Sequence, residues 1–212
     1  MNIKAAIFDY DGTIMDSMGF WDNIGELILK KLDIPVYEGF RERFFVMSQK
    51  EAARVFREEF GVNKSEKEII DLINNLADEY YKNEAMPKKG AIELLKKYKS
   101  KGIKLALATA SIREHIILSA TRLGFYDLFD AIYTCTELDT TKNSPLIYNT
   151  AAMELGFLPK EIAVFEDSVV ACHTAKDAGF YTIGVYDSSQ AYNEKEMREF
   201  CDEYTLDFSD IF

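Results

Sequence analysis

Short apolar runs alternate along the chain with longer segments in which apolar residues recur at helical spacing. A short continuous apolar run is typical of a strand buried on both faces, and apolar residues three or four positions apart are typical of an amphipathic helix. Buried strands are predicted at residues 3–8, 103–108, 131–135, 161–165 and 181–185. Helices are predicted at residues 90–100, 113–123, 146–155 and 168–178. This order predicts an α/β fold, with a Rossmann-like, doubly wound parallel sheet and crossover helices.

One stretch interrupts this alternation. Between residues 15 and 86 no buried strand is evident, and the apolar residues follow helical spacing throughout. We therefore predict an α/β core formed by residues 1–14 and 87–212, with a helical domain, residues 15–86, inserted after the first strand. The acidic C-terminal end, which contains tyrosine and phenylalanine, is expected only as structure at the edge of the sheet.

The charge balance restricts the classes of partner. The chain has 36 acidic and 25 basic residues, a net charge of -11, so its overall field repels nucleic acids and anionic membranes. No apolar run is long enough to span a membrane. We expect no nucleic-acid or membrane partner and, by default, a monomer. The field also opposes phosphorylated small molecules, so an anion site would need its own local positive charge.

The cysteines and the first residues bear on location. Cys135, Cys172 and Cys201 are odd in number and share no metal-ligand spacing, which favours a reducing compartment without disulfides. The first apolar run is too short for a secretory signal. These features predict a cytoplasmic location.

Polar residues follow the predicted strands at their carboxyl ends, where open α/β sheets bind ligands. They are Asp9 and Asp11 in the segment 9–13, the segment 109–111, Lys142, and Glu166 with Asp167. Neighbouring carboxylates repel one another unless a cation lies between them, and carboxylate oxygens suit Mg²⁺. Hydroxyl groups and backbone amides bind phosphoryl oxygens, and an aspartate can attack phosphorus to form an aspartyl-phosphate.

Each of these segments also has a purely structural interpretation. Asp9 and Asp11 could belong to a turn that ends a strand, and Thr109 and Ser111 could cap a helix. The acids at residues 166 and 167 could begin a helix, where its dipole favours negative charge. The order and placement of all four segments together favour a shared site.

Four parts of the sequence resemble, in order, the four motifs of the haloacid dehalogenase (HAD) superfamily. They are Asp9-Tyr10-Asp11-Gly12-Thr13, Thr109, Lys142 and Glu166-Asp167-Ser168. The segment between Asp11 and Thr109 resembles the helical cap of its β-phosphoglucomutase-like and phosphoglycolate-phosphatase-like branch. The resemblance covers roughly residues 3 to 190.

This resemblance implies a role for each matching acid. Asp9 would be the nucleophile that takes the phosphoryl group. Asp11 would be the general acid toward the leaving oxygen and then the base that activates water. Mg²⁺ would be held by the Asp9 carboxylate, the Asp11 carbonyl and Asp167, with Glu166 at or near the ion.

The remaining matching residues would bind the phosphoryl group. Thr109, the Ala110 amide and Ser111 would hold its oxygens, and Lys142 would tie together the charges of the nucleophile and the phosphate. Mg²⁺ and Lys142 would then be the local positive charge that the acidic chain requires.

The sequence also departs from the family pattern. The segment after Lys142 reads Asn-Ser-Pro-Leu, where the branch commonly carries an acid at the position of Leu146, and Ala171 stands where a glycine is usual. Trp21 occupies the position at which the mutases carry a histidine, and His115 and His173 lie on predicted core helices. The missing histidine favours a hydrolase over a mutase.

We therefore predict a Mg²⁺-dependent phosphatase that hydrolyses a small phosphorylated metabolite, such as a sugar phosphate, through an aspartyl-phosphate. The alternatives are a sugar phosphomutase and a non-catalytic phosphate-binding relative. The long insert excludes a receiver domain of a signalling protein. Residues of the insert that could contact substrate are Asp16, Ser17, Trp21, Arg41, Arg43, Met47, Ser48 and Lys50.

Overall fold

The computed structural model of the chain describes residues 3–36, 47 and 49–211. The chain divides into two compact units. The first, here called the α/β unit, comprises residues 1–17 and 85–212, and the second, the helical unit, comprises residues 18–84. Where the chain leaves and re-enters the α/β unit, Met15 and Pro87 form a β-bridge. No helix among the described residues is both long enough and apolar enough to span a membrane.

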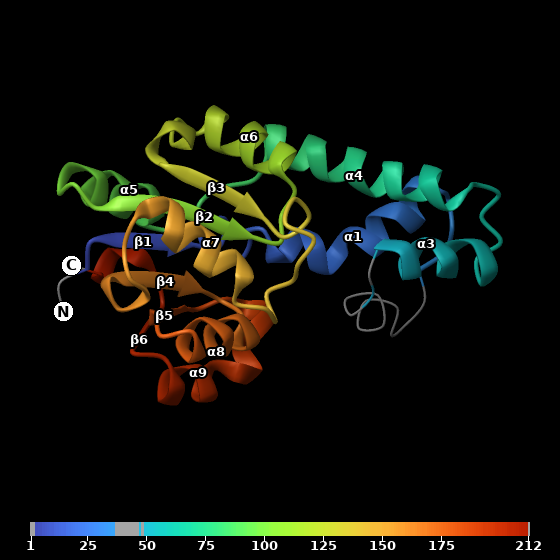
Figure 1. Cartoon of the computed structure of the whole chain (residues 1–212). Helices are drawn as coiled ribbons and strands as arrows, with labels where there is room; N and C mark the ends of the chain where they lie inside the picture. Colours follow the sequence, from blue (N-terminus) through green and yellow to red (C-terminus); the bar gives the residue numbers. More distant parts are fainter. Residues whose placement is uncertain (1–2, 37–46, 48, 212) are drawn as a thin grey trace. The chain divides into compact units, whose positions relative to one another are not determined.

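The α/β unit contains a parallel sheet of six strands in the described chain, with the order β3-β2-β1-β4-β5-β6 (Figure 1). Its strands are β1 (Ala5–Phe8), β2 (Lys104–Thr109), β3 (Ala131–Thr134), β4 (Ile162–Glu166), β5 (Tyr181–Val185) and β6 (Glu203–Thr205). Since β1 has β2 on one side and β4 on the other, the order of strands reverses beside β1. The predicted α/β class and parallel sheet are confirmed, and β6 adds an edge strand that the apolar pattern did not reveal.

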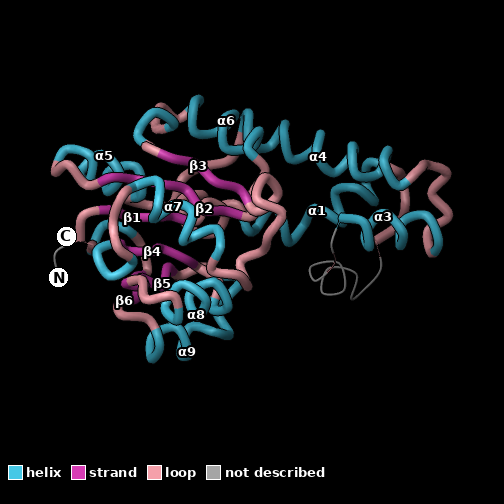
Figure 2. The backbone as a smooth tube through the Cα atoms, in the orientation of Figure 1, coloured by secondary structure: helices cyan, strands magenta, loops and turns pink. Residues whose placement is uncertain are grey.

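Helices cover both faces of the sheet (Figure 2). They are α5 (Ala91–Ser100), α6 (Arg113–Arg122), α7 (Leu146–Leu155), α8 (Val169–Asp177) and α9 (Glu194–Phe200). Alternate residues of β1 point to opposite faces, so Ala5 and Ile7 share an apolar core with Ile147 of α7. On the other face the Phe8 ring stacks on Phe165, with ring centroids 4.3 Å apart. Burial on both faces explains why the strands are continuous apolar runs.

The helical unit consists, in its described part, of α1 (Met18–Lys31), α3 (Gln49–Glu58) and α4 (Glu66–Asn83). Ile28, Phe56 and Ile73, one from each helix, lie in a common buried core. A capping box begins α4, in which the backbone N–H of Glu68 donates to the Ser65 hydroxyl and the Ser65 N–H donates to the Glu68 carboxylate. Helix-period apolar residues and this cap account for the helical character of the insert.

Candidate active site

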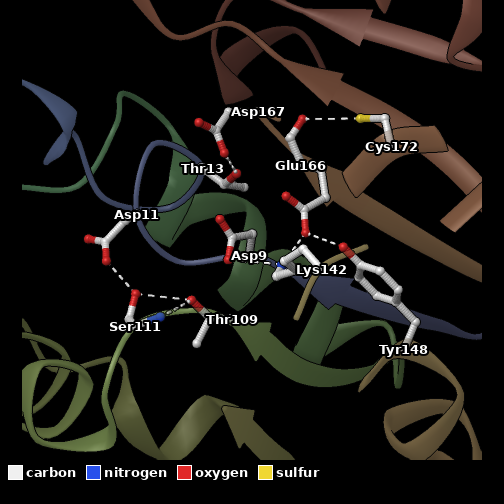
Figure 3. Close-up of polar contacts among 10 residues, drawn as sticks. All are labelled: Asp9, Asp11, Thr13, Thr109, Ser111, Lys142, Tyr148, Glu166, Asp167 and Cys172. Atoms are coloured by element: carbon white, nitrogen blue, oxygen red, sulfur yellow. Dashed lines mark hydrogen bonds and ion pairs between the residues drawn. The ribbon is translucent and has the colours of Figure 1, made fainter. Parts of the chain in front are cut away.

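Three buried carboxylates meet at the carboxyl edge of the sheet (Figure 3). Asp9 follows β1, and Glu166 ends the neighbouring strand β4, which pairs with β1 in the register Phe8↔Phe165. Asp167 comes next in the chain. One oxygen atom from each of the three carboxylates lies within 4.8 Å of the others. The parallel register therefore brings together acids that are far apart in the sequence.

Lys142 enters this group from the loop between β3 and α7. Its Nζ donates to the Asp9 Oδ1 atom at 3.1 Å and also to the Glu166 carboxylate. The Tyr148 hydroxyl, on α7, donates to the same Glu166 oxygen at 2.6 Å. Glu166 thus has one oxygen bound to both a lysine and a buried phenol. Lys142 thus lies beside Asp9, the predicted nucleophile.

The electrostatics of this group show an excess of negative charge. Burial raises the pKa of Glu166 to about 8, with Lys142 opposing and Asp9 and Asp167 adding to the rise. Burial and the charge of Asp9 likewise raise the pKa of Asp167. Burial alone would lower the pKa of Lys142, but Asp9 and Glu166 raise it above its ordinary value. Carboxylates held this close remain ionised when a cation joins them.

The donor set fits Mg²⁺. Asp9, Glu166 and Asp167 are 8%, 1% and 5% exposed, offer oxygen ligands only, and converge on one point. Mg²⁺ prefers oxygen ligands and is commonly bound by a few carboxylates together with water and substrate phosphate. Among the described side chains, these three residues could therefore hold the ion.

Asp11 belongs to a second polar group beside the first. The Ser111 hydroxyl donates to its Oδ2 atom, and the Ser17 hydroxyl donates to its Oδ1 atom at 2.5 Å. Thr109, at the end of β2, accepts a hydrogen bond from the backbone N–H of Ser111 at 3.1 Å. Figure 3 shows Asp9 between this group and Glu166. Ala110, the third predicted phosphate-binding residue, lies between Thr109 and Ser111 in the loop that follows β2.

The loop after β1 is shaped by Gly12, whose φ of 76° is in the left-handed region that glycine adopts without steric cost. The turn aims the Thr13 hydroxyl at the Asp167 Oδ1 atom, to which it donates at 3.1 Å. Thr13 is fully buried. This hydrogen bond fixes the loop after β1 to the residue that follows β4.

The remaining residues singled out in the sequence lie in different places. Arg41, Arg43 and Ser48 are outside the described residues. Lys50 is exposed at the start of α3, and Asp16 is exposed beside the β-bridge of the α/β unit.

Trp21 and Met47 line a cavity of about 260 Å³ within the helical unit. Trp21 donates its indole N–H to the Tyr81 hydroxyl at 2.9 Å. His115 is buried on α6, and His173 pairs with Glu196 at 2.8 Å.

Tyr148 is a partner of the acid cluster that the sequence interpretation did not find. It lies on α7, and its position in the sequence marks it only as one of the apolar-face residues of that helix. The hydrogen bond to Glu166 appears only once α7 has packed on the sheet. Cys172 is buried, and its thiol lies 3.7 Å from the Glu166 carbonyl oxygen.

Comparison with known proteins identifies the family. The family model described as haloacid dehalogenase-like hydrolase matches residues 3–179. The chain is 26% identical over 181 residues to the phosphorylated carbohydrates phosphatase of Thermotoga maritima, covering 85% of this chain and 84% of the relative. It is 31% identical over 192 residues to the β-phosphoglucomutase of Bacillus subtilis, covering 86% and 83%.

The fold agrees with solved structures. The structure of CbbY from Rhodobacter sphaeroides in complex with phosphate superposes with a TM-score of 0.79. The superposition covers 98% of this chain and 96% of the other, at 24% identity.

Proposed function

The chain belongs to the haloacid dehalogenase-like hydrolases, and on that premise we propose that it is a Mg²⁺-dependent phosphatase acting on a small phosphorylated sugar or similar metabolite. The observation that carries the proposal is the position of the Asp9 carboxylate. It lies within 4.8 Å of two further buried acids and 3.1 Å from the Lys142 ammonium group. A carboxylate placed between a cation site and a lysine can approach a dianionic phosphoryl group without prohibitive repulsion.

In the proposed reaction an Asp9 oxygen forms a bond to phosphorus as the bond from phosphorus to the ester oxygen breaks. Asp11 gives its proton to the leaving alcohol oxygen. Asp11 then takes a proton from a water molecule, whose oxygen attacks phosphorus and breaks the bond to Asp9. The products are the alcohol and inorganic phosphate, and both aspartates return to their starting states.

The hydrogen bonds of the site support these roles. Ser17 and Ser111 hold the two Asp11 oxygens, which orients the carboxyl group for proton transfer. Lys142 stays protonated beside Asp9 and offsets charge on the phosphoryl oxygens. When bound by Asp9, Glu166 and Asp167, Mg²⁺ would supply the remaining positive charge. Thr109, Ser111 and the Ala110 amide would bind phosphoryl oxygens.

A sugar phosphomutase is the second candidate, because one relative, at 31% identity, is named as a β-phosphoglucomutase. Trp21 argues against it. A mutase of this branch would carry a histidine there, whereas here the indole N–H is engaged by Tyr81 within the helical unit. We therefore favour hydrolysis.

The proposal is tested with Asp9→Asn and an aryl phosphate in Mg²⁺. Release of phosphate should fall by at least about a thousandfold, while Asp127→Asn, an exposed acid on the α/β unit, should leave the rate unchanged. Retained turnover in Asp9→Asn would refute the assignment of the nucleophile. A panel of phosphorylated sugars, assayed for phosphate release and for isomer formation with a bisphosphate primer, separates phosphatase from mutase.

A further inference from the structure

A fourth buried acid lies at the same edge of the sheet. Among the described side chains the buried acidic residues are Asp9, Glu166, Asp167 and Asp187, and only the first three belong to the proposed Mg²⁺ ligands. Asp187 follows β5, the strand beside β4, and the register Glu166↔Gly184 places the ends of both strands side by side. Asp187 therefore emerges close to Asp167.

Asp187 is paired with a lysine that has no assigned role. Lys88 Nζ lies 2.8 Å from the Asp187 Oδ2 atom, and the two side chains are 9% and 3% exposed. The same ammonium group donates to the Tyr186 carbonyl oxygen. The other Asp187 oxygen accepts from the Ser189 backbone N–H at 2.9 Å and from its hydroxyl at 2.7 Å. Both side chains are thus largely buried, and each makes at least two polar contacts.

The backbone also ties this pair to the site. The Lys88 N–H donates to the Ile14 carbonyl oxygen at 2.8 Å. Ile14 is the neighbour of Thr13, whose hydroxyl binds Asp167. The backbone at Lys88 is therefore connected to Asp167 through Ile14 and Thr13 in the loop after β1. In agreement, the charge of Lys88 lowers the pKa of Asp167 and the charge of Asp187 raises it, although burial and Asp9 have the larger effects.

The charges of the buried acids and lysines indicate how the pair acts on the metal site. The four buried carboxylates face two lysines, Lys142 and Lys88. When all are ionised, the three proposed ligands and Lys142 leave two negative charges, which a divalent cation balances, and the neutral pair of Lys88 and Asp187 leaves this number unchanged. Without Asp187 the positive charge of Lys88 would oppose the incoming ion, and without Lys88 the charge of Asp187 would be left buried and uncompensated.

We propose that Lys88 and Asp187 act on Mg²⁺ binding as a charge-compensated pair, in which Asp187 cancels the positive charge that Lys88 would otherwise place beside the acid cluster. Neither residue touches substrate or reacting atoms. The proposal rests on the proposed function, because it concerns the affinity of the same metal site. It predicts that each member of the pair affects Mg²⁺ binding through its charge and that the two effects cancel.

The test uses the metal-free chain and Mg²⁺ alone as the probe, with binding measured by calorimetry and by the rise in unfolding temperature with MgCl₂. Asp187→Asn should weaken Mg²⁺ binding on the order of threefold to tenfold. The double variant Lys88→Met with Asp187→Asn should restore the wild-type affinity, because the net charge is again that of the wild type. Lys88→Met alone should not weaken binding.

The neighbouring pair Lys89 and Asp207 is the matched control. Its Nζ and Oδ2 atoms are 3.0 Å apart, but its side chains are 77% and 27% exposed. Both pairs line one cavity of about 330 Å³. Lys89→Met and Asp207→Asn should leave Mg²⁺ affinity unchanged, since solvent screens an exposed pair.

The outcomes separate this inference from the proposed function. If the double variant binds Mg²⁺ as weakly as Asp187→Asn, or if Asp187→Asn binds as the wild type does, the charge role is overturned while the phosphatase proposal stands. If the wild-type chain binds no Mg²⁺, both proposals fall together. Far-UV circular dichroism of each variant checks folding, and the double variant avoids leaving a buried charge unpaired.

Discussion

Replacing Tyr148 with phenylalanine removes one oxygen atom from the interior of the α/β unit. The phenol is fully buried, and its hydroxyl donates to a Glu166 oxygen at 2.6 Å. Burial and the nearby acids raise the pKa of Tyr148 well above its ordinary value, so the group remains a donor throughout the accessible pH range. After the change, Lys142 is the remaining described partner of that oxygen.

Tyr10 offers a matched comparison. It is also fully buried, and its hydroxyl lies 2.6 Å from the Ser119 hydroxyl. Ser119 donates its own hydrogen to the His115 carbonyl oxygen, so Tyr10 donates to Ser119. The two tyrosines therefore lose the same atom, but one loses a hydrogen bond to a carboxylate and the other loses a hydrogen bond to a neutral hydroxyl.

The difference sets the expected magnitudes. A hydrogen bond to a charged group contributes about 1.5–3 kcal/mol, and one between neutral groups contributes about 0.5–1.5 kcal/mol. Tyr148→Phe should lower the free energy of unfolding by about 2 kcal/mol, and Tyr10→Phe by about 1 kcal/mol. Urea unfolding of the metal-free chain at about pH 9, above the pKa of about 8 of Glu166 so that its carboxylate is ionised, measures both by fluorescence and circular dichroism. Equal losses, or a larger loss for Tyr10→Phe, would refute the argument that the charged acceptor makes the difference.

Two further predictions concern stability. Gly90 and Gly102 both have positive φ, but an added Cβ would lie 2.8 Å from a backbone nitrogen at Gly90 and meets nothing within 4 Å at Gly102. In urea unfolding Gly90→Ala should therefore cost about 2–4 kcal/mol and Gly102→Ala about 1 kcal/mol, and equal costs would contradict the clash. Burial raises the pKa of Asp130, but hydrogen bonds from Lys99, a backbone N–H and Lys104 together outweigh burial. The net pKa is lowered to about 2. This depressed pKa stabilises the fold above about pH 4 and the contribution is lost as the pH falls toward 2. Asp130→Asn should remove about 1 kcal/mol at pH 7, after allowance for solvent screening, and should flatten the acid limb of the stability curve.

The five strands that the apolar runs predict agree with the structure to within two residues at each end. The predicted strand at 181–185 has the same bounds as β5, and those at 161–165 and 103–108 differ by one residue at each end from β4 and β2. Strands buried on both faces are continuous apolar runs, so their pattern needs no tertiary information. Strand β6 (Glu203–Thr205) has only β5 as a partner and contains a charged residue. Its three residues carry no such pattern.

The acids of the site could also be predicted, because each follows a recognisable strand. Lys142 and Ser111, which bind these acids, were also among the predicted residues, but other partners could not be predicted. Tyr148 and Lys88 meet Glu166 and Asp187 only through packing and loop geometry, and nothing in their sequence spacing points to an acid far along the chain. Residues at or just after strand ends were thus accessible from local pattern, whereas Tyr148 and Lys88 are identified only by tertiary contacts.

The departure at Leu146 illustrates the same principle. The family commonly places an acid at this position, and its absence bears on the support of the loop around Lys142 rather than on the lysine itself. In the structure Leu146 is 47% exposed. Lys142 instead binds Asp9 and Glu166, which lie at the ends of two central strands. Its ammonium group also lies 5.2 Å from the centre of the Tyr148 ring. Charge-assisted hydrogen bonds to buried acceptors fix a lysine more firmly than a neighbour on an exposed turn can. The position of Lys142 therefore follows from the acid cluster itself, and the missing acid removes no contact on which that position depends.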